Sequence, residues 1–197
     1  MSSVPKVEYS EIKNPIRMLY TGDLYIGRDK SLLKLVKALE KMPKDSFFLD
    51  VYTKSEISDF VKAQLNEEIC RIHAPISQKE VLELQKTADV LLFLEDIDGP
   101  DANVARLSFS TKTTDYLSSG RCIFAIGNKN TAPMQYFIKN DSALVAGSEN
   151  EISDILNSVS ESPKLLLKYA QKAADIGIKN HSKENIQRTF DEVISRV

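Results

Sequence analysis

The 197-residue sequence has little of the chemistry that marks several common classes of protein. Its two cysteines, Cys70 and Cys122, are far apart, and each lies in or beside an apolar run. We therefore interpret both as buried side chains rather than as a disulfide or a metal pair. No stretch approaches the ~20 apolar residues that a membrane span needs, and the N-terminus lacks a signal peptide. These absences predict a soluble cytoplasmic protein.

Neither sign of charge dominates the composition. The chain has 26 basic and 28 acidic residues, a net charge of −2, so we expect no broad basic face and no nucleic acid partner. The glycine-rich phosphate loops are also missing, since the sequence contains neither G-K-[ST] of a Walker motif nor G-x-G-x-x-G of a dinucleotide fingerprint. What remains is a chain long enough to bury about 70% of its unfolded surface without metal or disulfides.

Strand-like and helix-like segments alternate along most of the chain. Strands are predicted at about 16–21, 46–53, 68–73, 88–94, 121–127 and 142–146. Helices are predicted at about 29–42, 55–66 and 77–85, in a short segment from 112, near Pro133, and at 149–159, 163–179 and 183–196. The unbroken apolar run ADVLLFL is typical of a strand covered on both faces. We predict an α/β fold, a three-layer Rossmann-like sandwich with about six parallel strands and extra C-terminal helices.

The predicted domain division is simple. Residues 1–14 are polar and without clear periodicity, so we interpret them as a linker or arm. Residues 15–197 form the Rossmann-like domain, whose ligands are expected at the carboxyl ends of its strands.

The segment Leu107–Gly127, LSFSTKTTDYLSSGRCIFAIG, is the most informative part of the sequence. Hydroxyl side chains crowd a loop and the first turn of a short helix, where they can cap free amides. Lys112 lies in that first turn, although the helix dipole favours negative charge there. An anion such as phosphate, bound by Lys112 and the free amides, explains the position. A solvated lysine that tolerates a small penalty explains it as well.

These residues also resemble a known family. The pattern T-K-x-x-D-Y-L-x-x-G-R-x-I is similar to S-K-x-x-E-Y-L-x-x-G-K-P-I of nucleotide-sugar glycosyltransferases with the GT-B fold. It most resembles the C-terminal, donor-binding domain of the retaining family that has two glutamates eight positions apart. Asp115 stands at the second of these positions, while Leu107 stands at the first, so the first acid is absent.

The resemblance implies a binding role for residues along the whole chain. It implies that Gly22 allows a close approach of the backbone at the end of the first strand and that Arg28 contacts a diphosphate. Ile76 would lie against the nucleobase, and Asp115 would hold the ribose hydroxyls. The amides of Ser110 and Thr111, together with Lys112, would complete the diphosphate site. No catalytic residue, metal ion or cofactor is assigned. His73, at a strand end, could contact the base or be satisfied by its neighbours.

Four acids, Glu95, Asp96, Asp98 and Asp101, follow the predicted strand at 88–94. They do not form an EF-hand loop, because no glutamate stands at the twelfth position. Asp96 and Asp98 form a D-x-D motif that resembles the metal motif of GT-A glycosyltransferases. We prefer to interpret these acids as a solvated loop and keep the metal-dependent GT-A transferase as an alternative.

The predicted function is therefore donor binding for glycosyl transfer from a nucleotide-diphosphate sugar. In the family an N-terminal GT-B domain supplies the acceptor pocket, so we expect this chain to be inactive without it. A peripheral position at the inner membrane face is expected for the full-length enzyme. A non-catalytic nucleotide-binding module is a further alternative. The apolar stripe of the last helix is expected to pack on the domain's own core, or to mediate self-association if the N-terminal domain is missing.

Overall fold

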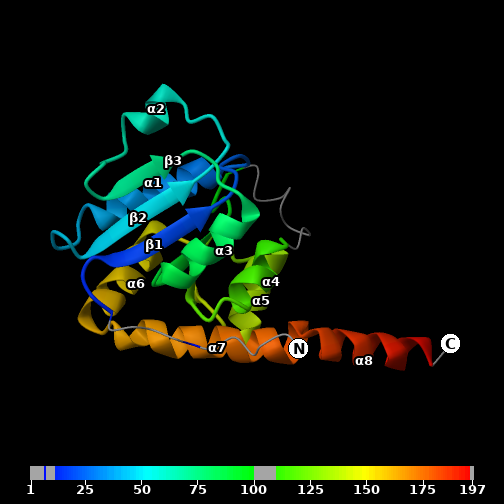
Figure 1. Cartoon of the computed structure of the whole chain (residues 1–197). Helices are drawn as coiled ribbons and strands as arrows, with labels where there is room; N and C mark the ends of the chain where they lie inside the picture. The colour runs from blue at the N-terminus through cyan, green and yellow to red at the C-terminus, as the bar shows by residue number, and fades with distance from the viewer. Residues whose placement is uncertain (1–6, 8–11, 100–109, 196–197) are drawn as a thin grey trace.

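The computed structural model of the protein describes Val7 and residues 12–99 and 110–195. Six parallel strands form one sheet in the order β3-β2-β1-β4-β5-β6 (Figure 1). The strands are β1 (Ile16–Thr21), β2 (Phe47–Tyr52), β3 (Cys70–His73), β4 (Val90–Leu94), β5 (Cys122–Ile126) and β6 (Leu144–Ala146). The predicted parallel sheet is confirmed. Most of the predicted arm at 1–14 lies outside the described residues.

Helices cover both faces of this sheet, as the three-layer prediction requires (Figure 1). They are α1 (Arg28–Leu39), α2 (Asp59–Lys62), α3 (Gln78–Thr87), α4 (Lys112–Leu117), α5 (Ala132–Asn140), α6 (Glu149–Glu161), α7 (Lys164–His181) and α8 (Lys183–Ile194). Helices α1 and α6 pack on one face, while α3, α4 and α5 pack on the other. Helix α7 contributes to both apolar clusters, so it joins the two layers.

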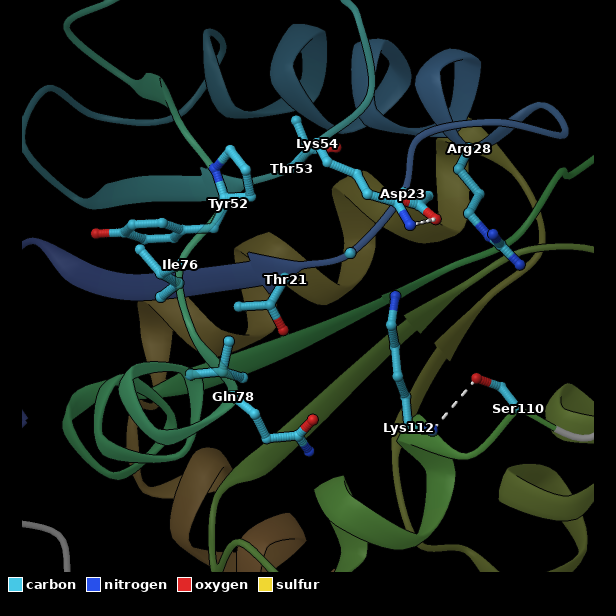
Figure 2. Close-up of a pocket in the computed structure, with 13 residues that line it drawn as sticks. Thr21, Asp23, Arg28, Tyr52, Thr53, Lys54, Ile76, Gln78, Ser110 and Lys112 are labelled. Atoms are coloured by element: carbon cyan, nitrogen blue, oxygen red, sulfur yellow. Dashed lines mark hydrogen bonds and ion pairs between the residues drawn. The ribbon is translucent and has the colours of Figure 1, made fainter.

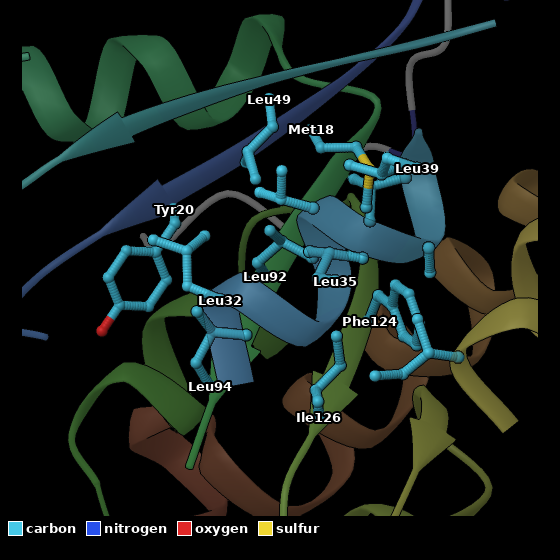
Figure 3. Close-up of a cluster of buried hydrophobic side chains, with 14 of the residues drawn as sticks. Met18, Tyr20, Leu32, Leu35, Leu39, Leu49, Leu92, Leu94, Phe124 and Ile126 are labelled. Carbon is cyan, nitrogen blue, oxygen red and sulfur yellow. The ribbon is translucent and has the colours of Figure 1, made fainter. Parts of the chain in front are cut away.

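The alternation of side chains along each central strand builds the two halves of the core. In β1, Met18 and Tyr20 point towards α1, whereas Leu19 lies in the opposite cluster. Figure 3 shows the first cluster, with Leu32 and Leu35 of α1 lying over the strands. Every residue of β4 is buried, which confirms the prediction of a strand covered on both faces.

One helix differs clearly from its prediction. The helix expected at 55–66 is reduced to the single turn α2. The hydroxyl of Ser55 accepts a hydrogen bond from the amide of Leu24 at 2.8 Å, and its own amide donates to Thr53 Oγ1 at 2.9 Å. These contacts hold the chain in an extended loop against the β1–α1 connection, so the helix begins only after Ser58, whose hydroxyl caps it.

The last two helices are arranged differently with respect to the sheet. Helix α7 runs past β5 and α4, and α8 continues from its C-terminal end away from the α/β body (Figure 1). Ile194 at the end of α8 is exposed. The apolar side chains at 186, 190, 193 and 197 lie outside the described residues, so the predictions about the stripe stay predictions. No helix of the described part is long and apolar enough to cross a membrane.

Candidate functional site

A pocket of about 520 Å³ lies at the carboxyl ends of β1, β2 and β3, facing the start of α4 (Figure 2). The strand order reverses between β1 and β4, and open parallel sheets bind ligands at this point. The pocket is lined by Thr21, Gly22, Asp23, Arg28, Tyr52, Thr53, Lys54, Pro75, Ile76, Gln78, Val81, Ser110 and Lys112. The structure therefore brings Gly22, Arg28, Ile76, Ser110 and Lys112 of the predicted site together.

Lys112 enters this pocket through a narrow slot beside β1. Its Nζ lies over the ring of Tyr20, 4.9 Å from the centroid, and against the backbone of Gly22. Burial, and next the neighbouring charge of Arg28, lower the pKa of Lys112 to about 8. None of the described residues forms an ion pair or a hydrogen bond with this ammonium group. A partly buried cation without a carboxylate in direct contact is costly, so its position suits a site that receives an anion.

Arg28, at the start of α1, contacts the end of β4 and the residue that follows it. Its Nη2 lies 3.1 Å from both carboxylate oxygens of Glu95, and its Nε donates to the carbonyl of Leu94 at 3.1 Å. Glu95 is only 4% exposed, and its carbonyl accepts a hydrogen bond from Ser31 Oγ at 2.6 Å. The guanidinium group therefore keeps a fixed orientation at the pocket, while Glu95 neutralises part of its charge.

The loop before α4 brings Ser110, but not Thr111, to the lining of the pocket. Ser110 Oγ accepts a hydrogen bond from the amide of Lys112 at 3.3 Å, so this hydroxyl caps the first turn. Thr111 is exposed at the N-cap position, makes no side-chain capping bond and does not line the pocket.

Asp115 also lies apart from the pocket lining. Its carboxylate is exposed on the first turn of α4, although partial desolvation raises the pKa of this group. The contact between Asp115 and ribose hydroxyls stays a prediction. Leu107, at the position of the absent first acid, lies outside the described residues.

Ile76 belongs to an apolar wall opposite the cations, formed with Pro75, Val81 and the ring of Tyr52. It precedes α3, whose start is fixed by a capping box between Ser77 and Glu80. The adjacent Gln78 side chain lines the pocket from the first turn of α3 (Figure 2). This wall can hold a flat apolar group, and the amide of Gln78 offers both a donor and an acceptor.

His73 is satisfied by its neighbours. Its Nε2 lies 2.6 Å from Asp50 Oδ1, and its ring stacks on Tyr52 with centroids 4.4 Å apart and an interplanar angle of 12°. It does not line the pocket. The His73 ring packs against the Tyr52 ring, which itself lines the pocket.

Sequence reasoning missed several pocket residues, among them Asp23, Tyr52 and Lys54. A signal for them exists in the sequence. Each lies at or just after the end of a predicted strand, and the carboxyl ends of parallel strands meet at one edge of the sheet. Applied to every strand, this rule would have identified them.

The interpretation of the acids after β4 as a solvated loop is wrong for Glu95 and Asp96, which are 4% and 1% exposed. The carboxylate of Asp96 accepts a hydrogen bond from the amide of Gly99 at 3.1 Å, and the backbones of Gly27 and Gly99 pack against it. Small residues at these positions make room for the buried acid.

Asp98 forms an ion pair with a lysine, whereas Asp96 accepts a hydrogen bond from a backbone amide. Asp98 is exposed and pairs with Lys34 at 3.0 Å. The two carboxylates of the D-x-D motif therefore have separate partners, and the described residues contain no group of three or more metal-ligating side chains. Asp101 lies outside the described part.

No family model matches the sequence, and no curated protein matches it. Solved structures match its fold. Anabaena HepE in complex with UDP aligns with a TM-score of 0.70 at 14% identity over 94% of this chain and 50% of that one. TarM aligns at 0.69 with 12% identity over 95% of this chain and 37% of that one. The C-terminal domain of LpcC, a group 1 glycosyl transferase from Francisella tularensis, aligns at 0.65 with 15% identity over 88% and 89%.

These structures confirm the predicted fold. The chain has the architecture of the C-terminal domain of GT-B glycosyltransferases. It spans at most half the length of HepE and TarM but most of the isolated LpcC domain.

Proposed function

We propose that this chain is the donor-binding domain of a glycosyltransferase that uses a nucleotide-diphosphate sugar. The observation that carries the proposal is the convergence of Lys112 and Arg28 beside Gly22, in a pocket at the reversal of the strand order. Guanidinium and ammonium groups bind phosphates, and a pocket of this volume accommodates a ligand of nucleotide size. The similar fold of HepE was solved with UDP and with UDP-glucose.

The chemistry of the lining suggests how the donor would lie. Its diphosphate would occupy the region between Lys112, Arg28 and the hydroxyl of Ser110. Its base would rest on the apolar wall of Ile76, where the edge of the base can meet Gln78. The free amide at Thr111 and the carboxylate of Asp115 would then contact the phosphate and the ribose from α4.

Cleavage of the glycosidic bond leaves negative charge on the departing nucleoside diphosphate. Lys112 and Arg28 would stabilise that charge as it develops, which is electrostatic catalysis by groups held in place before the reaction. The acceptor pocket would come from an N-terminal domain, because all described pocket residues belong to one α/β unit. The isolated chain should therefore bind the donor and transfer its sugar slowly or not at all.

A nucleotide-binding module without transferase activity is the second candidate. It is favoured by the position of Asp115 outside the pocket lining and by the leucine at position 107. Both candidates predict nucleotide binding. They differ in one respect, since only a donor domain restores sugar transfer when combined with a matching N-terminal domain.

The first experiment is a thermal-shift panel with UDP, GDP, ADP and CMP at millimolar concentration, with and without EDTA. A ligand that binds only the folded state raises its stability by RT ln(1 + [L]/Kd), so weak binding is detectable. We expect one diphosphate to raise the melting temperature in EDTA, and Lys112→Ala to abolish the shift. A shift that requires manganese would instead favour the GT-A alternative. No shift with any nucleotide would contradict the proposal.

A further inference from the structure

Asp23 is an acid in a pocket that otherwise presents cations. Among the thirteen described residues that line the pocket, it alone carries a carboxylate, and Arg28, Lys54 and Lys112 surround it. Its Oδ2 lies 3.5 Å from Lys54 Nζ, and Figure 2 shows this pair among the residues that line the pocket. The pair is therefore located where the phosphates of a nucleotide would lie.

Asp23 and Lys54 differ in how strongly the surrounding structure fixes their positions. The carbonyl of Asp23 accepts a hydrogen bond from Tyr20 Oη at 2.6 Å. The amides on either side, of Gly22 and Leu24, donate to the Tyr52 carbonyl at 2.9 Å and to Ser55 Oγ at 2.8 Å. Lys54, by contrast, has a side chain that is 70% exposed. The acid is thus anchored by its backbone, whereas the lysine can turn on its flexible stem.

An exposed ion pair of this kind contributes little to stability, so it opens at small cost. A phosphate group carries more negative charge than a carboxylate and attracts the same lysine. We propose that Asp23 pairs with Lys54 in place of an anionic ligand, and that Lys54 exchanges Asp23 for the phosphates when a nucleoside diphosphate binds. This inference rests on the proposed function. It adds Lys54 as a third phosphate-binding cation and Asp23 as a residue that opposes binding.

The proposed exchange predicts how Asp23 affects the preference of the pocket for a diphosphate over a monophosphate. Asp23 repels every bound anion, and it also competes for Lys54 with a ligand that has enough charge to recruit this lysine. Both effects are therefore greater for a diphosphate than for a monophosphate. Removal of the carboxylate should tighten the binding of both ligands and increase the difference between them.

The test measures dissociation constants by titration calorimetry for UDP, UMP and, as a probe that does not depend on the base, pyrophosphate. We expect Asp23→Asn to tighten UDP and pyrophosphate about tenfold and Lys54→Gln to weaken them by a similar factor, as charges a few ångströms apart produce in a partly exposed site. In the Lys54→Gln background, Asp23→Asn should tighten the binding of UDP and pyrophosphate by a smaller factor than in the wild-type protein. The reason is that no Lys54 remains for which the carboxylate could compete.

The chain contains a matched control pair. Asp59 and Lys62 of α2 form another exposed ion pair with an N–O distance of 3.5 Å, and neither residue lines the pocket. Asp59→Asn and Lys62→Gln make the same changes in net charge, so they should alter the dissociation constants by less than about twofold. A tenfold effect in the control variants would overturn the inference, since it would reflect net charge alone.

Two further outcomes would also overturn it. If Asp23→Asn weakens UDP, Asp23 itself contacts the ligand, for example through a hydroxyl group. If Asp23→Asn and Lys54→Gln leave both ligands unchanged while the wild-type protein binds them, the ion pair takes no part in binding and the proposed function stands without it. A wild-type protein that binds neither UDP nor pyrophosphate would contradict the proposed function together with this inference.

Discussion

Gly22 makes room for the ammonium group of Lys112. A Cβ atom at Gly22 would overlap Lys112 Nζ and would lie 2.7 Å from its Cε. The backbone of Gly22 has φ +139°, which disfavours any L side chain. The backbone conformation favours glycine at the end of β1, and any side chain there would displace the end of Lys112 from the pocket.

Gly22→Ala should destabilise the domain and displace Lys112. We expect a loss of about 1–3 kcal/mol in the free energy of unfolding, from backbone strain and overpacking, and a weaker response to nucleoside diphosphates. Chemical denaturation and the thermal-shift panel measure the two effects. In the Lys112→Ala background, the destabilisation should be smaller, because the side chain that clashes is gone. An equal cost in both backgrounds would show that the two residues are not coupled.

Lys112→Met should stabilise the domain while it removes ligand binding. The gap between the ordinary pKa of 10.5 and about 8 for Lys112 corresponds to at most about 3 kcal/mol of unfavourable free energy at neutral pH. Methionine keeps the apolar stem without the charge. We expect a higher melting temperature and no shift with nucleotides. Lys54→Met, which removes an exposed ammonium, should change the melting temperature little.

The contribution of Lys112 to the stability of the protein should rise with pH above about 8. Lys112 loses its proton near pH 8 when folded but near 10.5 when unfolded, so the unfolded state binds more protons between these values. The contribution of Lys112 to the free energy of unfolding therefore increases with pH in this interval, whereas the two buried cysteines, whose pKa values are raised, contribute equally to the wild-type protein and to a Lys112 variant. The measurement is urea denaturation from pH 7.5 to 10 for the wild-type protein and Lys112→Met. Their difference should narrow as the pH rises, and a constant difference would contradict the assignment to Lys112.

Both cysteines should resist modification while the protein is folded. Cys70 and Cys122 are buried and form no disulfide, which agrees with their interpretation from the sequence as buried side chains. Burial raises the pKa of Cys70 to about 12 and that of Cys122 further, so neither forms the reactive thiolate at neutral pH. Mass spectrometry after treatment with iodoacetamide should find no adduct in buffer and two in denaturant. Rapid labelling in buffer would show that one of these sites opens.

Gly177→Ala should separate α7 from α4. An added Cβ would lie 2.6 Å from the carbonyl oxygen of Leu117, at the end of the helix that carries Lys112. We expect a loss of about 1–2 kcal/mol of stability, because a backbone atom cannot move aside as a side chain can. Gly147→Ala is the matched control, since its Cβ would meet only the flexible Lys129 side chain at 3.0 Å or more. Equal effects in calorimetry would contradict the proposed packing.

Local sequence patterns determined most of the architecture. The run of apolar residues in β4, the capping box at Ser77 and the periodic stripes of the long helices depend on neighbours a few residues away. They therefore specified the strands, most helices and the edge of the sheet at which the pocket lies. The position of Lys112 at the start of a short helix was correctly predicted for the same reason.

Only the tertiary structure decided how the side chains of the pocket are paired. The slot that Gly22 provides for Lys112, the Arg28–Glu95 pair and the Asp23–Lys54 pair join segments far apart in the sequence. The long-range contact of Ser55 with Leu24 likewise shortened α2. Such pairings depend on which strand ends become neighbours and on which charges lose their water. No local pattern encodes either, so the sequence located the candidate pocket and the fold determined its electrostatics.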